Sequence, residues 1–181
     1  MRVRFNEKKA TQVAAQILKA HGGNMDLLDL MKKIYCVDRA ALVKLRWPLT
    51  GDRYSALPKG MVLSHTYDLA KDEDFEYPTY WDQYIERGGD FEVSLVNDPG
   101  RDELSENEVQ LITSTLESLK NVDRTTMIQE IHHKYPEWSD PKGSSFVVMY
   151  ETVLQNEGWQ QEEIEALSDQ VAIHTQFECA F

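Results

Sequence analysis

The sequence predicts a mainly α-helical fold: a compact helical domain with a small two-stranded antiparallel β-sheet. Three observations lead to this prediction. Most apolar residues recur at helical spacing, two short stretches alternate as strands do, and turn residues separate the segments. The chain has 181 residues, of which 41% are hydrophobic, and this composition suits one domain with its own core.

Two helices are predicted in the first quarter of the chain. Residues 6–20 have helical spacing, and His21-Gly22-Gly23 ends that segment. We expect His21 to bond the free carbonyls at this helix end rather than to act in catalysis. Asn24 is expected to cap a second amphipathic helix, which starts near Leu27 and stops before Pro48.

One polar residue interrupts the apolar stripe of the second helix. Asp38 lies on that stripe between Ile34 and Leu42. A carboxylate buried there without partners would be strongly destabilising, so Asp38 must be paired or hydrogen-bonded. Residues 50–52 read as a turn after Pro48, from which Arg53 can fold back toward the helix. We therefore predict that Asp38 is tied to this turn.

The remaining elements follow from periodicity and turn residues. Strands are predicted at residues 53–57 and 91–96, and we expect them to pair antiparallel. A short helix within a loop is expected between residues 71 and 90. Further helices are predicted at residues 61–70, 105–119, 121–135, 144–156 and 161–177, the second of which opens with the capping-box spacing of Ser105 and Glu108.

Composition excludes several classes of function. No apolar run approaches the length of a membrane span, the start MRVRFNEKK lacks the hydrophobic segment of a signal peptide, and two cysteines form no disulfide framework. A reduced, cytoplasmic setting is expected. The net charge is −12, and residues 60–181 carry the acidic excess, whereas residues 1–59 hold 12 Lys or Arg against 5 Asp or Glu. An acidic chain argues against general nucleic-acid binding and favours a basic protein partner.

No catalytic, metal or cofactor site is predicted. His132 and His133 point about 100° apart on a helix, so they do not form a shared metal site. His65 is placed to pair with Asp68, and Thr50-Gly51-Asp52 has too few glycines and carboxylates to hold phosphate or metal. A hydrolase that uses Asp38 or His65 remains an alternative of another class.

A longer pattern resembles a known family. The run KKIYCVDRAAL, followed by WPLTGDRYSALPKGMVLSHTYDL, is similar to the Panacea domain of the SocA-like antitoxins of bacteria and phages. The resemblance covers roughly residues 10–140 and includes a helix opening at Leu104-Ser105-Glu106 and a later helix ending at Glu137-Trp138. It implies a Panacea domain at residues 1–140, on which a helical extension, residues 141–181, is packed. The residues that we expect to maintain the motif structure are Asp38, Arg39, Thr50, Gly51, Asp52, Arg53, Pro58, Gly60 and Trp138.

The resemblance implies an antitoxin rather than an enzyme. Such a protein neutralises a co-encoded toxin, commonly a translation inhibitor, by forming a direct complex with it. An adaptor that delivers the toxin to a protease is the alternative, and a second copy of the chain stays open as a further partner. We expect the toxin to contact exposed apolar residues in turns and loops, steered by the acidic residues 72–76. These residues are Trp47, Met61, Tyr80 and Trp81; at two of them, Trp47 and Met61, the sequence departs from the family pattern.

Overall fold

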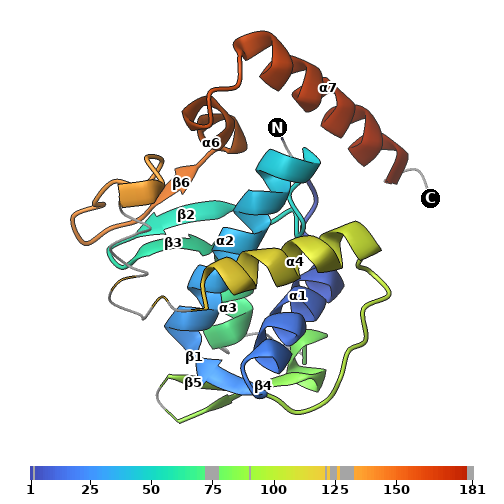
Figure 1. Cartoon of the computed structure of the whole chain (residues 1–181), viewed down its shortest axis with the longest axis vertical. Helices are drawn as coiled ribbons and strands as arrows, with labels where there is room; N and C mark the ends of the chain where they lie inside the picture. The colour runs from blue at the N-terminus through green and yellow to red at the C-terminus, as the bar shows by residue number, and fades with distance from the viewer. Residues whose placement is uncertain are drawn as a thin grey trace.

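The structure, a computed structural model, has six α-helices and two three-stranded sheets in the part of the chain that it describes (Figure 1). It describes residues 1, 3–71, 78–89, 91–120, 122, 126 and 133–178, with side chains as far as residue 175. The helices are α1 (Glu7–Ala20), α2 (Leu27–Leu45), α3 (Ser64–Lys71), α4 (Glu106–Ser118), α6 (Tyr150–Asn156) and α7 (Gln161–Glu178), and η1 (Trp81–Gln83) is a short 3-10 helix. The strands are β1 (Asn24–Asp26), β2 (Tyr54–Leu57), β3 (Gly60–Leu63), β4 (Ile85–Gly88), β5 (Glu92–Leu95) and β6 (Phe146–Val148).

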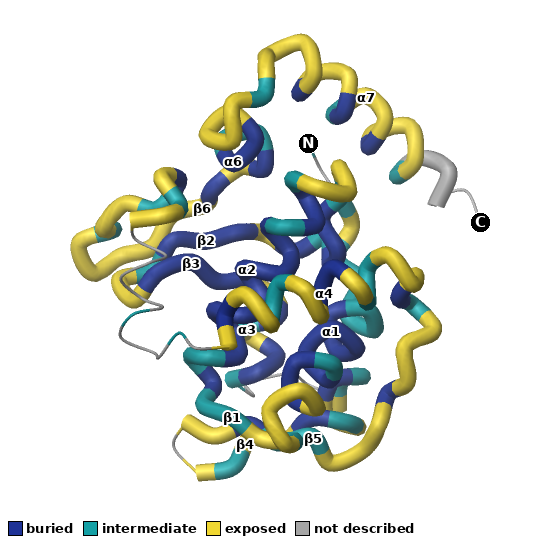
Figure 2. Tube along the Cα trace, in the orientation of Figure 1, coloured by how far each residue is buried: buried dark blue, intermediate teal, exposed yellow. Residues whose placement is uncertain are grey.

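Helix α2 is the centre of the fold. It packs against α1, α4 and β3, and most of its side chains are buried (Figure 2). The predicted apolar stripe is buried from Leu27 to Leu42, whereas Leu45 at its end is exposed. Its N-terminus differs from the prediction. Asp26, not Asn24, caps the helix by accepting from the backbone N–H of Leu28, while Asn24 belongs to strand β1. Arg46, the C-cap residue directly after the helix, adopts a left-handed conformation, with φ of 60°, two residues before Pro48.

The predicted single two-stranded sheet is wrong. Strand β2 does not pair with the segment near residue 92; it lies between β3 and β6, in the order β3-β2-β6. Strand β5 forms the middle of the other sheet, in the order β1-β5-β4. Both alternating segments are therefore strands, but each has partners that the sequence pattern did not reveal, since alternation indicates a strand and not its neighbour.

A tight hairpin replaces the start of a predicted helix. Pro58 and Lys59 join β2 to β3, and Gly60, with φ of 105°, opens the returning strand. Met61, Val62 and Leu63 are all buried, so they form an uninterrupted apolar run that is compatible with either a strand or a helix. Helix α3 begins only at Ser64, so the prediction of helix from residue 61 is wrong for its first three residues.

Helices α1 and α4 both begin with a side-chain cap, of which only the cap of α4 was predicted. The side chain of Asn6 accepts from the backbone N–H of Lys9 at the start of α1, and Nδ1 of His21 lies 2.8 Å from the Ile17 carbonyl at its end. Ser105 and Glu108 form a complete capping box at the start of α4, which confirms the predicted spacing. The helix predicted at residues 121–135 falls largely outside the described residues.

The C-terminal segment is part of the central structure. Residues 144–156, predicted as one helix, form strand β6 followed by the shorter helix α6. Strand β6 extends the sheet of β2 and β3, and α6 packs against α2. Helix α7 follows and presents a buried face, with Ile164, Leu167 and Val171, and an exposed outer face (Figure 2). In the described part of the chain, no helix combines the length and apolar character that crossing a membrane requires.

Candidate functional site

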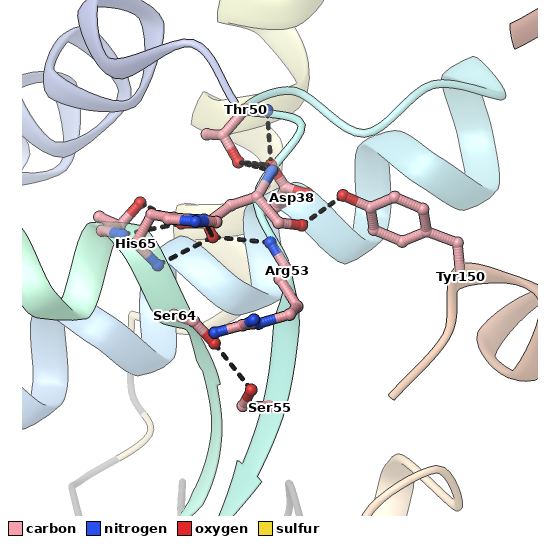
Figure 3. Close-up of polar contacts among 9 residues, drawn as sticks. Asp38, Thr50, Arg53, Ser55, Ser64, His65 and Tyr150 are labelled. Atoms are coloured by element: carbon pink, nitrogen blue, oxygen red, sulfur yellow. Dashed lines mark hydrogen bonds and ion pairs between the residues drawn. The ribbon is translucent and has the colours of Figure 1, made fainter. Parts of the chain in front are cut away.

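Asp38 and the turn after α2 form a closed hydrogen-bonded unit (Figure 3). One carboxylate oxygen of Asp38 accepts from the backbone N–H and the hydroxyl of Thr50, both at 2.8 Å, and the other accepts from the Tyr54 hydroxyl at 2.7 Å. Asp38 thus contacts the predicted turn, but Arg53 does not serve as its partner, because the Arg53 side chain is exposed. Neutral donors therefore satisfy the carboxylate.

The surroundings of Asp38 favour its protonated form. Complete burial raises the pKa of the carboxyl from 3.8 to about 6, although the bonds from Tyr54 and Thr50 oppose the rise. The nearby carboxylate of Asp52 adds to the rise. Because Asp38 is inaccessible to solvent and both of its oxygens are occupied, it is shielded from any substrate.

Asp52 joins the turn to helix α3. One of its carboxylate oxygens accepts from the backbone N–H of His65 at 2.9 Å, and the other accepts from the backbone N–H of Thr66 at 2.8 Å. These are orphan donors at the start of α3, so Asp52 acts as a cap from outside the helix. Nδ1 of His65 also lies 2.8 Å from Asp52. His65 therefore pairs with Asp52 and not, as predicted, with Asp68.

A tyrosine from the C-terminal segment completes the unit. The hydroxyl of Tyr150 donates to the backbone carbonyl of Asp52, and its ring lies edge-on to that of Tyr54, with centroids 4.8 Å apart. Tyr150 is buried and lies outside the segment that resembles the family. No sequence signal indicated this contact, since 98 residues separate the two hydrogen-bonded groups.

Gly51 permits the N-terminal segment to cross the turn. Its φ of 65° falls in the region that favours glycine, and a Cβ added there would collide with the Arg4 carbonyl. The N-terminal segment stays beside the turn after Arg4, because the backbone N–H of Asn6 donates to the Thr50 carbonyl at 2.9 Å. Gly51 is thus needed both for the turn and for the close approach of another segment.

Arg39, which follows Asp38, lies in a second polar cluster. Its Nε donates to Glu137 at 2.6 Å, its NH2 group lies 2.8 Å from the Glu157 carboxylate, and its guanidinium covers the Tyr135 ring. Tyr35 donates to the same Glu137 oxygen at 2.6 Å. Burial alone would raise the pKa of Glu137, but these donors more than offset it and hold the pKa below its ordinary value.

Trp138 of the motif and Lys32, which was not among the predicted motif residues, both contact the hairpin. Nε1 of Trp138 donates to the Leu57 carbonyl at 3.0 Å, just before the turn at Pro58 and Lys59. Lys32 of α2 is almost fully buried, and its Nζ donates to the Met61 carbonyl at 3.0 Å. Burial lowers the pKa of Lys32 to about 8. The motif residues therefore connect α2, the hairpin and the segment near Glu137.

The four predicted partner-binding residues do not share one exposed surface. The expectation that Met61 and Trp81 are exposed is wrong, because Met61 is fully buried in strand β3 and Trp81 is 2% exposed. Trp47 and Tyr80 are half-buried. Trp47 borders a pocket of about 380 Å³ beside the turn and packs edge-on against His174 of α7, with ring centroids 4.9 Å apart. Tyr80 lies against Tyr84.

The structure does not describe some of the residues that the sequence analysis considered for partner or metal binding. The acidic residues 72–76 and His132 lie outside the described residues. In the described part of the chain, no group of three or more metal-ligating side chains is present. Glu137 could have been noticed from the sequence as an acidic residue before Trp138, but its partnership with Arg39 spans 98 residues and left no local signal.

The fold and the motif define a mainly helical domain in which the turn after α2 is bonded to that central helix. The family model described as "Antitoxin SocA-like, Panacea domain" matches residues 30–139. The chain therefore belongs to the SocA-like Panacea-domain family, as its sequence pattern predicted. Comparisons with curated proteins and with solved structures gave no significant match.

Proposed function

We propose that this protein is an antitoxin that neutralises a co-encoded toxin by forming a direct complex with it. The observation that carries the proposal is family membership over residues 30–139, which include every motif residue on α2 and the turn. Occlusion of the toxin's active or substrate-binding surface is the mechanism, and a translation inhibitor is the kind of toxin that this family implies.

The motif supports binding rather than catalysis. Asp38 is fully buried and bonded at both oxygens, so it offers no group to a substrate. His65 is oriented by Asp52, but the neighbouring hydroxyl of Ser64 is paired with Ser55 at 2.7 Å rather than with the imidazole. A histidine that activates a side-chain nucleophile needs that nucleophile within hydrogen-bond reach. The arrangement instead rigidifies the turn, which favours a binding module.

Trp47 and Tyr80 remain the predicted contact residues from the original set. Both are large and half-buried, and Trp47 borders a pocket beside the turn. Tryptophan and tyrosine are frequent anchors of protein interfaces. The acidic charge of residues 60–181 would steer a basic toxin toward the complex, and we expect the association rate to fall as salt is added.

Co-expression with the product of the adjacent reading frame tests the proposal. We expect the two proteins to copurify, and the antitoxin to restore growth that the toxin alone arrests. Failure of both would contradict the proposed function. If growth is restored only when a particular cellular protease is present, the protein is an adaptor instead.

Substitution of Trp47 tests its role in binding. Trp47→Ala should weaken the complex by about 2 kcal/mol or more if Trp47 is an interface anchor. His174→Ala is the matched control, because it removes the ring that Trp47 contacts on α7 and leaves Trp47 in place. Equal losses in the two variants would show that Trp47 acts by holding α7. Trp81→Ala is unsuitable here, since its buried ring would leave a cavity in the core.

A further inference from the structure

Strand β6 carries a cluster of exposed apolar side chains. Phe146 is 37% exposed, Val147 is 48% exposed and Met149, directly after the strand, is 51% exposed. These are three of the seven large apolar residues that are exposed in the described part of the chain, and they lie within four positions. Because side chains alternate between the faces of a strand, Val147 and Met149 lie on one side, where both line the same pocket, and Phe146 lies on the other. Single exposed apolar residues are ordinary, whereas neighbouring ones on one face mark an interaction surface.

The backbone of this strand has an open edge. Strand β6 pairs with β2 on one side only and lies at the border of the sheet (Figure 1). Among the described residues, no backbone group of residues 146–148 bonds to a segment other than β2. The opposite border is better covered, because β3 packs against α2 and the Met61 carbonyl accepts from Lys32. An uncovered edge of this kind can accept another strand.

An apolar pocket adjoins the same strand. It has a volume of about 340 Å³, and its lining includes Val147 and Met149 from the β6 region and Val3 and Phe5 from the N-terminal segment. Arg53 and His65 also line it. The Arg53 side chain is exposed and forms no ion pair with a described residue. The pocket therefore suits an apolar side chain of a partner, and Arg53 suits a carboxylate of the same partner beside it.

We propose that an extended segment of the toxin adds to β6 as a fourth strand of the β3-β2-β6 sheet. One of its apolar side chains enters the pocket beside Val147, and an acidic side chain pairs with Arg53. Strand addition supplies main-chain hydrogen bonds, and the pocket and the arginine supply specificity. This inference rests on the proposed antitoxin function and adds the place and the chemistry of the contact.

Charge favours such a segment over a second copy of the chain. Each copy carries a net charge of −12, so association of two copies works against their mutual repulsion. Residues 146–149 also contain no carboxylate, so the same strand of a second copy has none to offer Arg53. A toxin that is basic overall, with a segment that alternates apolar and acidic residues, meets both requirements.

Two exposed positions allow the inference to be tested with little risk to folding. Val147→Lys places a charge on the strand edge, and Arg53→Glu reverses the charge at the pocket. We expect each to weaken binding of the adjacent reading frame's product by about tenfold or more, measured calorimetrically with folded, full-length protein. Ile173→Lys, at an exposed position of α7 outside the proposed site, is the matched control and should bind nearly as wild type does.

The outcomes separate this inference from the proposed function. If the wild type binds the toxin, and Val147→Lys and Arg53→Glu both bind it with the same affinity, the strand-addition site is wrong. The antitoxin function is then unaffected. No binding by the wild type overturns both. Hydrogen exchange supplies an independent measurement: the amides of residues 146–148 should be protected when the toxin is added. If they are protected in the free protein at high concentration, and sedimentation shows a dimer that Val147→Lys dissociates, the occupant is a second copy and the inference is wrong.

Discussion

Asp38 and Glu137 are both buried carboxylates, yet their surroundings shift the two pKa values in opposite directions. Asp38 receives bonds only from neutral donors, so burial prevails and raises its pKa to about 6. Glu137 is bonded by the Arg39 guanidinium as well as by Tyr35, and its pKa is lowered. The presence of a cation therefore decides which carboxylate favours ionisation in the folded protein.

The raised pKa of Asp38 predicts how its contribution to stability depends on pH. A carboxyl that binds its proton more tightly when folded stabilises the protein fully below its ordinary pKa of 3.8, and this contribution is lost as the pH rises through about 6. Relative to Asp38→Asn, which does not titrate, the wild type should gain roughly 2–3 kcal/mol of unfolding free energy between pH 7 and pH 4. Urea unfolding of both proteins measures this, and a pH-independent difference would contradict it.

Substitution of the two acidic partners of Arg39 is expected to lower the unfolding free energy by unequal amounts. The Glu137 side chain is fully buried, whereas that of Glu157 is 37% exposed. Glu137→Gln should lower the unfolding free energy at neutral pH by about 2–4 kcal/mol, because it breaks a buried ion pair. Glu157→Gln should cost less than about 1 kcal/mol, as solvent screens that pair. Chemical denaturation of the two variants decides the matter; similar losses would show that burial is not what distinguishes them.

At the scale of elements, the turn after α2 holds three segments together. Asp38 anchors it to α2, Asp52 caps α3, and the carbonyl of Thr50 bonds the start of α1. These contacts use backbone groups that would otherwise lack partners at the ends of the two helices. The turn thereby positions the N-terminal segment beside the pocket next to β6.

Gly51 provides a direct test of this arrangement. Gly51→Ala should lower the unfolding free energy by about 2–4 kcal/mol, because the new methyl group would displace the Arg4 backbone in addition to straining the turn. Gly158→Ala is the control: Gly158 also has a positive φ, of 85°, but a Cβ there meets nothing within 4 Å. Its substitution should cost about 1 kcal/mol. Equal costs, measured by thermal or urea unfolding, would show that the contact with Arg4 has little energetic weight.

At the scale of the whole molecule, the C-terminal segment extends the central sheet and covers the motif. Strand β6 pairs with β2, Tyr150 bonds the Asp52 carbonyl, and Val153 and Leu154 are fully buried. The family match ends at residue 139, before all of these contacts. The expected division into residues 1–140 and a packed extension thus places a substantial part of the core in the extension.

Truncation after residue 140 should therefore impair folding as well as binding. It would expose one edge of β2 and remove Tyr150 from the motif, and we expect a loss of several kcal/mol in stability. Circular dichroism and urea unfolding of residues 1–140 measure this directly. A cooperative transition at the wild-type denaturant concentration would show that the extension is an independent addition. Full-length variants are accordingly the better test of where the toxin binds.

Much of the helical architecture was predictable because its signals are local. The helical spacing of α1, the capping box of α4, the stripe on α2 and the break before Pro48 all depend on residues within a few positions of one another. The need for a partner at Asp38 was also apparent from the sequence, since an unpaired carboxylate is unstable within an apolar stripe. Family membership could be predicted in the same way from a continuous run of motif residues.

Only the tertiary structure determined which strands pair and which side chains contact one another. The sheet order β3-β2-β6, the bond of Tyr150 to Asp52 and the pair of Arg39 with Glu137 join residues far apart in the chain. It also placed Met61 and Trp81 in the interior. The physical reason is that alternation and hydrophobicity specify which side chains must be buried, whereas the neighbour that buries them depends on how all the segments pack together.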